Sequence, residues 1–409
     1  MAERRRGSAK ASRRAVTGHL VGMLALTTLV FGVGAVQKAA CANEAWVERR
    51  EGPGFQCYSD VADLRRTEQL LGGRLPYLEP CAPSAPAGSC DEYPVLTMYL
   101  MRASAWVAGT GGDPYTRFYW VNAALLLVCA LVTTRQLERL GAATALFAGA
   151  PILAVHGTTN WDLVPVALTA VATARFLTGR ATAAGAWLGV GAAAKVYPGI
   201  ASVAFALDRL RSGRRADAAR LLVASAIAWL ALNLPFALAA PEGWSVFFRS
   251  NATRPAEYDT LWRVACELGA CAPTGVVALG SVVLTVAGTW WAWTVRLRHA
   301  PSTPGWTIAF PLLVLFVLTS KVWSPQYGLW LLPLFALLAP SFRPWLAWQT
   351  GEVLVYLARF AFFEELAAGT ASYASFGIAV VLRAGALAWC LVAWARATAD
   401  RRGPVLSVR

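Results

Sequence analysis

Long apolar runs separated by short polar segments recur along this chain from residue 17 to residue 395. An apolar run of roughly 20 residues can cross a bilayer as a helix, and shorter runs are typical of tilted or half-spanning helices. The runs lack the polar stripe that a helix on a soluble core carries. We therefore expect an all-α, polytopic membrane protein with about twelve transmembrane helices. The expected spans are 17–36, 115–134, 142–155, 163–178, 182–195, 197–207, 221–239, 274–295, 306–319, 327–339, 344–363 and 372–395.

The short apolar segment 93–108 decides the topology. If it crossed the membrane, the basic clusters after it would face the side opposite to the basic N-terminus. If it lies in the outer interface, every basic cluster returns to the inside, as the positive-inside rule requires. A Tyr-Pro pair opens the segment and Arg102 lies in its middle, and both features favour an interfacial helix over a span. We expect such a helix after the first outer loop, with both termini in the cytoplasm.

The same charge pattern divides the chain into three parts. We expect a basic cytoplasmic tail at 1–16, a transmembrane domain at 17–395 that includes an outer loop at 37–114, and a second cytoplasmic tail at 396–409. The part of the outer loop at 37–92 holds nine Asp and Glu against six Lys and Arg, whereas the inward loops are short and basic. Polar residues also collect in a second outer loop, expected at 240–273. Function should therefore concentrate on the outer face.

Composition agrees with a membrane protein, because 57% of the residues are hydrophobic and 15% are charged. A soluble domain has about 25% charged residues. The net charge of +14 raises the question of a nucleic-acid partner. The Lys and Arg residues stand in short clusters between apolar runs, so no basic stripe remains for a phosphate backbone. We exclude nucleic acid as a partner.

Six of the eight Cys residues fall in the two expected outer loops, which indicates an oxidising compartment and disulfides. Four Cys in the first loop allow three pairings, so the sequence leaves their pairing open. A zinc site would need nearby His or paired CxxC spacing, and we expect no metal. The two other residues, Cys129 and Cys390, lie in apolar runs and are expected to be inert core residues. The loop residues are Cys41, Cys57, Cys81, Cys90, Cys266 and Cys271.

The acidic stretch 55–63 follows the first apolar run and contains the main candidates for chemistry, Asp60 and Asp63. A carboxylate at a partly dehydrated surface can accept a proton from a sugar hydroxyl. Asp60 is therefore the candidate general base and Asp63 a candidate ligand. The alternative interpretation is a solvated loop carboxylate.

Two lysines, Lys195 and Lys321, stand near the outward ends of apolar spans, each followed by an aromatic residue and a Pro. Such a Lys either extends to the interface or binds an anion, and two on one face favour an anion such as a lipid phosphate. Asn160 and Asp162 stand where a span begins, so they could cap that helix, contact a substrate, or do both.

Glu352 lies inside an expected span, where a charge is costly. Arg359, seven residues further on, shares its helix face. We expect these two side chains to form a structural ion pair.

Six short motifs occur in a fixed order along nearly the whole chain. They are Cys-Tyr-Ser-Asp at 57–60, Gly-Arg-Leu-Pro-Tyr at 73–77, Glu-Tyr-Pro-Val-Leu-Thr at 92–97, Asn-Trp-Asp-Leu at 160–163, Gly-Val-Gly-Ala-Ala-Ala-Lys-Val-Tyr-Pro at 189–198 and Ser-Pro-Gln-Tyr at 324–327. In this order and topology the chain resembles glycosyltransferase family 87. These are α-(1,2)-mannosyltransferases of GT-C fold that depend on polyprenyl-phosphate mannose. The insertion between Cys81 and Cys90 departs from the family pattern and leaves the acceptor open.

The resemblance implies a mechanism. GT-C enzymes carry their catalytic base early in the first outer loop, which assigns that role to Asp60. A mannosyl or other hexosyl group would pass, with inversion, from a polyprenyl-phosphate sugar to a lipid or glycan acceptor on the outer face of the plasma membrane. Lys195, Lys321 or Arg254 would neutralise the leaving phosphate, so neither a metal nor a cofactor is expected. The residues expected to bind donor or acceptor are Asp63, Tyr93, Asn160, Asp162, Lys195, Tyr197, Arg254, Lys321, Gln326 and Tyr327.

The main alternative is a transporter or flippase of a lipid-linked sugar. A transporter should show repeated halves and broken helices near the midplane. This chain places its unusual polar residues at one face and shows no matched halves. A purely structural membrane protein would leave Asp60, Lys195 and Lys321 without a shared purpose. The sequence leaves the oligomeric state open and implies membrane lipids as further partners.

Overall fold

The computed structural model describes residues 2–82, 90–338 and 341–398, with side chains from residue 17 onward. Every regular element within this part of the chain is a helix. The helices are α1 (Ala2–Ala39), α2 (Glu44–Arg49), η1 (Phe55–Cys57), α3 (Asp60–Thr67), α4 (Val95–Ala108), α5 (Pro114–Arg139), α6 (Ala145–Ala148), α7 (Pro151–His156), α8 (Leu163–Leu177), α9 (Ala181–Ala192), α10 (Tyr197–Arg211), α11 (Arg215–Ala239), α12 (Pro241–Thr253), α13 (Leu261–Glu267), α14 (Thr274–His299), η2 (Gly305–Ile308), α15 (Ala309–Thr319), η3 (Pro325–Tyr327), α16 (Gly328–Leu338), α17 (Phe342–Ala367) and α18 (Tyr373–Arg396).

Five helices in the described residues are long and apolar enough to cross a membrane. They are Thr17–Ala39 of α1, α5, α11, α14 and α18. The all-helical, multi-pass membrane fold is therefore confirmed, whereas the count of twelve spans is not. The expected span at 142–155 is interrupted, because α6 ends before Gly149 and a new helix begins at Pro151. The loop expected at 240–273 contains two helices, α12 and α13.

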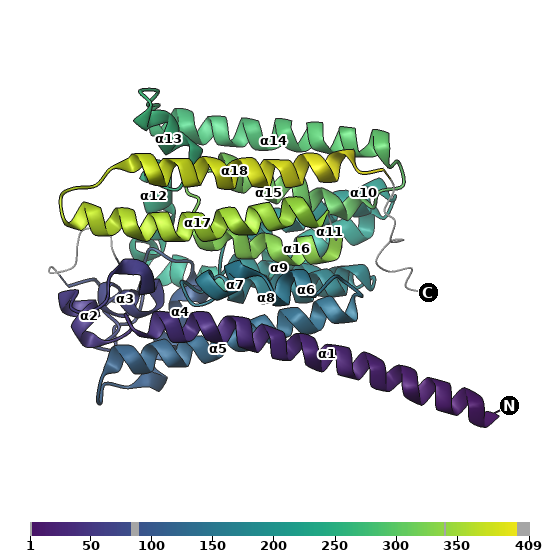
Figure 1. The fold of residues 1–409 in the computed structure, drawn as a ribbon, viewed down its shortest axis with the longest axis horizontal. Helices are drawn as coiled ribbons and strands as arrows, with labels where there is room; N and C mark the ends of the chain where they lie inside the picture. Colours follow the sequence, from purple (N-terminus) through teal and green to yellow (C-terminus); the bar gives the residue numbers. More distant parts are fainter. Residues whose placement is uncertain (1, 83–89, 339–340, 399–409) are drawn as a thin grey trace.

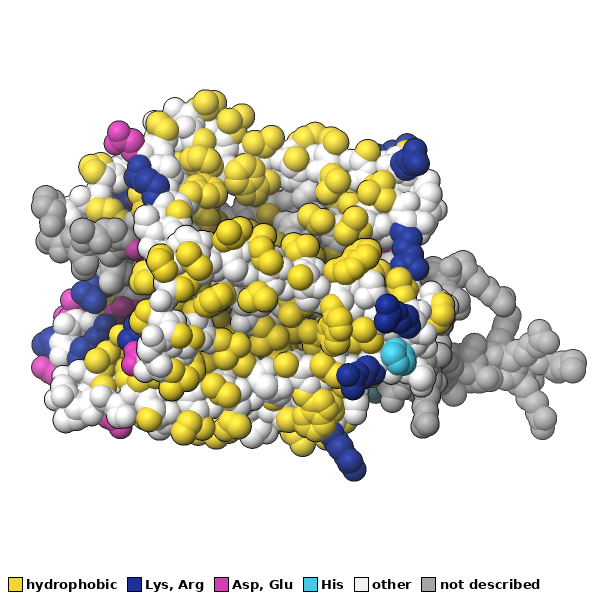
Figure 2. All heavy atoms as spheres, turned by 90° about the horizontal axis from the view of Figure 1, so that it is seen from above, with side chains coloured by type: hydrophobic (Ala, Val, Ile, Leu, Met, Phe, Trp, Pro, Cys, Tyr) yellow, Lys and Arg dark blue, Asp and Glu magenta, His cyan; other side chains and the backbone are white. Residues whose placement is uncertain are grey.

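The long helices run side by side along the longest axis of the molecule (Figure 1). One end, which we call the loop end, carries α2, α3, α12 and α13. The opposite end, where α1 begins and α18 ends, is called the tail end. Apolar side chains cover the middle of the face in Figure 2, acidic side chains gather at the loop end beside several Lys and Arg, and further Lys and Arg mark the tail end. This distribution agrees with the basic clusters sharing one side of the membrane.

Helix α4 does not run through the bundle. At its start, the Leu96 amide donates to the Ala193 carbonyl, and the Thr97 hydroxyl donates to the Ala194 carbonyl. Directly after its end, the Gly109 carbonyl accepts from Arg65 of α3, which belongs to the loop end. Both ends of α4 therefore lie at the loop end, which is the geometry expected for the segment 93–108. Its depth relative to a membrane interface stays a prediction.

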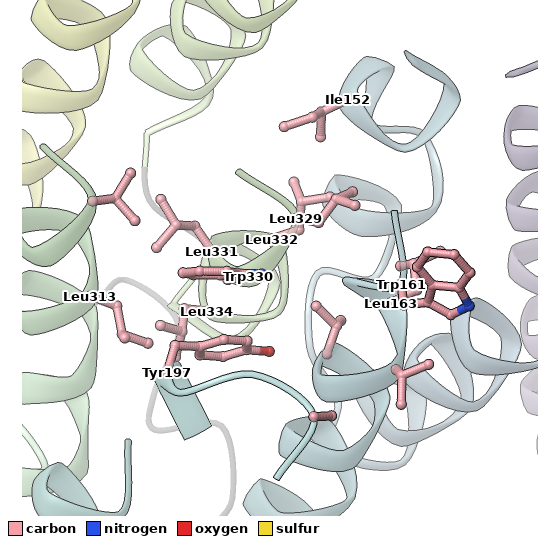
Figure 3. Packing of buried hydrophobic residues seen from close by; sticks show 14 of the residues in the cluster. Ile152, Trp161, Leu163, Tyr197, Leu313, Leu329, Trp330, Leu331, Leu332 and Leu334 are labelled. Carbon is pink, nitrogen blue, oxygen red and sulfur yellow. The ribbon is translucent and has the colours of Figure 1, made fainter. Parts of the chain in front are cut away.

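Helix α16 lies in the centre of the bundle. Residues 328–337 are all buried, as expected for a helix that is apolar on every side. Its Trp330 stacks on Tyr197 of α10, with ring centroids 4.5 Å apart (Figure 3). Close-packed aromatic rings of this kind make the core rigid near the loop end.

The structure pairs the loop cysteines that the sequence left open. Cys41 bonds to Cys57, Cys81 to Cys90, and Cys266 to Cys271. The first disulfide ties the end of α1 to η1, three residues before Asp60. Cys129 and Cys390 are free cysteines.

The expected ion pair between Glu352 and Arg359 is wrong. Glu352 instead accepts from Trp348 Nε1 at 2.8 Å and lies 3.5 Å from Arg383 of α18. Arg359 forms its ion pair with Asp259, in the linker between α12 and α13. Seven residues place two side chains on one helix face but two turns apart, so partners on neighbouring elements are closer.

Candidate functional site

A cavity of about 420 Å³ opens at the loop end. Its walls come from α3, the segments around residues 93, 160 and 196, α12 with the linker that follows it, the segment 320–327, and single residues of α15, α16 and α17. Nine of the eleven residues predicted for the site line this cavity. They are Asp60, Tyr93, Asn160, Lys195, Tyr197, Arg254, Lys321, Gln326 and Tyr327.

Asp60 is the first residue of α3, and the local sequence holds it there. Ser59 caps the helix by accepting from the Val61 amide, and its hydroxyl donates to the Thr158 carbonyl at 2.6 Å. A carboxylate in the first turn of a helix is favoured by the helix dipole. The Ser59 hydroxyl also anchors α3 to the segment that carries Asn160.

Two neutral donors orient the Asp60 carboxylate. The Asn160 side-chain amide donates to Oδ2 of Asp60 at 2.7 Å, and the Tyr58 hydroxyl also donates to Asp60. Burial, followed by the Asp60 and Asp63 carboxylates, raises the pKa of Tyr58 well above its usual value. The Tyr58 hydroxyl therefore stays protonated and remains a donor toward the carboxylate.

Asn160 is fixed in turn by its other bonds. Its amide nitrogen lies 2.7 Å from the Tyr93 hydroxyl, and its oxygen accepts from the Trp161 amide. Burial, followed by the Asp60 charge, raises the pKa of Tyr93 well above its usual value. Tyr93 therefore presents a protonated hydroxyl beside the candidate base.

Asp162 lies beneath the cavity and is not among its lining residues. It precedes α8 but makes no side-chain cap bond, so the capping interpretation is wrong. Its Oδ1 accepts from Trp330 Nε1 at 2.7 Å, and its Oδ2 lies 3.9 Å from Lys195 Nζ. Asp162 thus supports Lys195 from below.

Lys195 lies among aromatic rings. Its Nζ is 4.9 Å from the ring centroid of Tyr93 and 5.9 Å from that of Tyr327. Tyr327 stacks on Trp330, with centroids 3.8 Å apart. These flat rings form an apolar wall next to a cation, a combination that suits a sugar ring with an attached anion.

The cavity wall also carries Arg254 and Lys321. Arg254 lies 3.3 Å from Glu92 and 3.2 Å from Glu257, and Lys321 Nζ donates to the Ala252 carbonyl at 2.9 Å. Burial raises the pKa of Glu92 and lowers that of Lys321. Both shifts are in the direction of the neutral form, and an incoming anion would favour the charged form of Lys321.

Asp63 does not line the cavity. Its Oδ1 lies 2.8 Å from Arg50 and 3.6 Å from Arg66, both within the loop that follows α1. The structure gives this carboxylate a role in holding the loop together.

Several polar lining residues were missed by the sequence interpretation. They are Glu92, Asn251, Glu257, Ser320, Ser324 and Arg359. Glu92 adjoins Tyr93 in a motif, so adjacency could have indicated it. Arg359 and Glu257 carry no sequence signal, because only tertiary packing brings them to the cavity. Among the described residues, no group of three or more His, Cys, Asp or Glu is placed to hold a metal ion.

Comparison with known proteins gives a family. The model of glycosyltransferase family 87 matches residues 93–320. No curated protein matches the chain.

The chain is also similar to solved structures. ArnT from Cupriavidus metallidurans bound to undecaprenyl phosphate is 15% identical, with a TM-score of 0.46 over 93% of this chain and 77% of that one. The apo form of an oligosaccharyltransferase from Archaeoglobus fulgidus is 12% identical, with a TM-score of 0.43 over 94% of this chain and 57% of that one.

Proposed function

Because this chain belongs to glycosyltransferase family 87 and is a membrane glycosyltransferase, we propose that it transfers a mannosyl or other hexosyl group from a polyprenyl-phosphate donor. The observation that carries the proposal is the cavity itself. It places one oriented carboxylate, Asp60, in the same volume as the cations Lys195, Arg254 and Lys321. A general base that shares a cavity with several cations suits the attack of a hydroxyl on a phosphate-linked sugar.

The proposed reaction is a single inverting displacement. Asp60 accepts the proton of an acceptor hydroxyl as its oxygen attacks the anomeric carbon. The bond between that carbon and the phosphate oxygen breaks, and its electron pair leaves with polyprenyl phosphate. Cationic side chains stabilise the charge that develops on the phosphate, an effect that is strong in a partly dehydrated cavity.

A small aromatic cavity beside the main one supports a prenyl donor. A smaller cavity of about 30 Å³ shares Tyr93, Pro94, Val196 and Phe247 with the main one. Its walls also include Trp229 of α11 and Trp244 of α12. Helix α11 also exposes an apolar face, with Leu230 and Leu234 uncovered. A polyprenyl chain could therefore reach the cavity from the side of the bundle.

We further propose that the loop end faces the outside of the plasma membrane. Three disulfides lie at this end, which suits an oxidising compartment. The Lys and Arg at the tail end suit the cytoplasm. The acceptor would then be a lipid or glycan of the cell envelope.

The test is transfer of radiolabelled mannose from polyprenyl-phosphate mannose in membranes that contain the protein or its Asp60→Asn variant. We expect the variant to lose transfer and to keep donor binding. Glu51→Gln, an exposed acidic residue of the same loop, is the matched control and should transfer normally. Full transfer by Asp60→Asn would show that Asp60 is not the general base. If the unaltered protein moves the donor across the membrane without transferring its sugar, the result would favour a flippase.

A further inference from the structure

Arg383 of α18 is a fully buried arginine that the proposed reaction leaves unused. Its Nη2 donates to the Asp259 carbonyl at 2.7 Å, its Nη1 lies 3.5 Å from Glu352 Oε2, and its Cζ is 3.7 Å from the Trp323 ring centroid. Burying an ion costs several kcal/mol unless its partners compensate. The partners here belong to three separate segments: the α12–α13 linker, α17, and the segment 320–324.

Besides α17, which supplies Arg359, the other two segments also form walls of the cavity. The α12–α13 linker supplies Glu257, and the segment after α15 supplies Val322 and Ser324. Arg383 therefore links both segments, through the Asp259 carbonyl and the Trp323 ring, to the buried interior of the bundle. A planar guanidinium can do this because it offers several donors and a flat face at once.

The contact continues from Asp259 to the cavity. The Asp259 side chain is fully buried and forms an ion pair with Arg359 of α17. Arg359 lines the cavity, and its charge interacts with Glu257 and with Asp60. The Asp259 backbone is thus held by Arg383, while its carboxylate holds the Arg359 guanidinium at the cavity wall.

We propose that Arg359 binds the phosphate of the donor and that Arg383 is its positioning residue, acting through Asp259. The inference rests on the proposed function and adds to it a cation that sequence patterns do not reveal. A guanidinium held on one side by a carboxylate keeps further N–H donors for a phosphate, whose oxygens match its planar fork. Because its position is set before the substrate arrives, little reorganisation is needed as charge develops.

The first experiment measures Arg359 directly. Purified protein in detergent is titrated with farnesyl phosphate, with farnesol as the probe that lacks the phosphate, and transfer kinetics are measured with polyprenyl-phosphate mannose. We expect Arg359→Gln to lower kcat/KM about 100-fold. The same variant should weaken farnesyl phosphate binding about 10-fold, without affecting farnesol. Arg359→Lys should give values of kcat/KM and of farnesyl phosphate affinity between those of the unaltered protein and Arg359→Gln. The lysine keeps the positive charge but lacks the planar guanidinium with its paired N–H donors.

The second experiment asks whether Arg383 acts through Arg359. We expect Arg383→Lys and Asp259→Asn each to lower kcat/KM about 10-fold alone and to add little in the Arg359→Gln background. If the losses in kcat/KM multiply when Arg383→Lys is combined with Arg359→Gln, Arg383 acts independently of Arg359. That result would leave Arg383 a purely structural role and overturn the positioning assignment. Asp259→Asn keeps the backbone carbonyl that accepts from Arg383, so it tests separately whether the Asp259 carboxylate acts through Arg359.

The chain offers a matched control in Arg209 of α10. This buried arginine also donates to a carbonyl at 2.7 Å, lies 3.9 Å from an aromatic ring centroid, and is 3.4 Å from a carboxylate. It belongs to the α10 end that carries the basic cluster and does not line the cavity. Arg209→Lys should leave farnesyl phosphate binding and transfer unchanged, with the thermal midpoint reporting any loss of stability.

The two proposals fail in different ways. If the unaltered protein transfers mannose and Arg359→Gln binds and transfers within threefold of it, the phosphate assignment is wrong and the proposed function stands. If the unaltered protein transfers no hexose while farnesyl phosphate binding still depends on Arg359, the proposed function fails and the phosphate assignment stands.

Discussion

Asn160→Ala tests how the candidate base is held. The substitution removes the amide that donates to Asp60 at 2.7 Å and that lies 2.7 Å from the Tyr93 hydroxyl. A hydrogen bond to a charged group contributes roughly 1.5–3 kcal/mol. If this bond matters chiefly in the transition state, where Asp60 must point at the acceptor hydroxyl, its loss lowers kcat/KM by about 10- to 150-fold.

The assay is initial-rate transfer from polyprenyl-phosphate mannose at several donor concentrations. We expect most of the loss in kcat, because Asn160 orients the base rather than binding the donor. Asn43→Ala is the control: Asn43 caps α2 at the same end of the molecule and does not line the cavity. It should cost about 1 kcal/mol of stability without changing kcat/KM.

The reasoning would be refuted by one pattern of results. That pattern is Asn160→Ala transferring within threefold of the unaltered protein while Asp60→Asn is inactive. The base would then act without the orientation that the structure gives it.

Three further predictions concern stability. Burial raises the pKa of Glu68 to about 8, from about 4.3 in an unfolded chain. The folded protein therefore binds this proton more tightly than the unfolded chain does. The resulting stabilisation is fully present below about pH 4 and is lost as pH rises through about 8. The thermal midpoint of the unaltered protein should fall between pH 5 and pH 9 more steeply than that of Glu68→Gln, and parallel curves would contradict this. Cys57→Ser opens the disulfide to Cys41, a loop of 16 residues, and should cost roughly 3 kcal/mol in denaturant unfolding; an unchanged midpoint would show that the bond adds nothing. Trp330→Phe keeps a ring in the stack but leaves the buried Asp162 oxygen without its donor, so it should cost about 1–3 kcal/mol by the same measurement, and a neutral result would mean that another donor replaces the indole.

The sequence by itself determined the helical membrane class and the end of the molecule where chemistry gathers. Hydropathy is a local property, because the apolar residues of each run reflect the environment of that helix alone. The same holds for Lys195 and Lys321, because a cation near the end of an apolar run is costly wherever the helix packs. Motif order added Asp60, Tyr93 and Asn160, and these residues meet at one cavity.

Partners between distant segments were decided only by the tertiary structure. Periodicity within α17 pointed to a bond between Glu352 and Arg359, but each side chain pairs with another element of the chain. Asp63 and Asp60 lie three residues apart in α3, yet one faces arginines of the loop and the other the cavity. Helical spacing gives the face of a single helix and not what packs against it, so these contacts, like the disulfide pairing, follow only from how the helices are assembled.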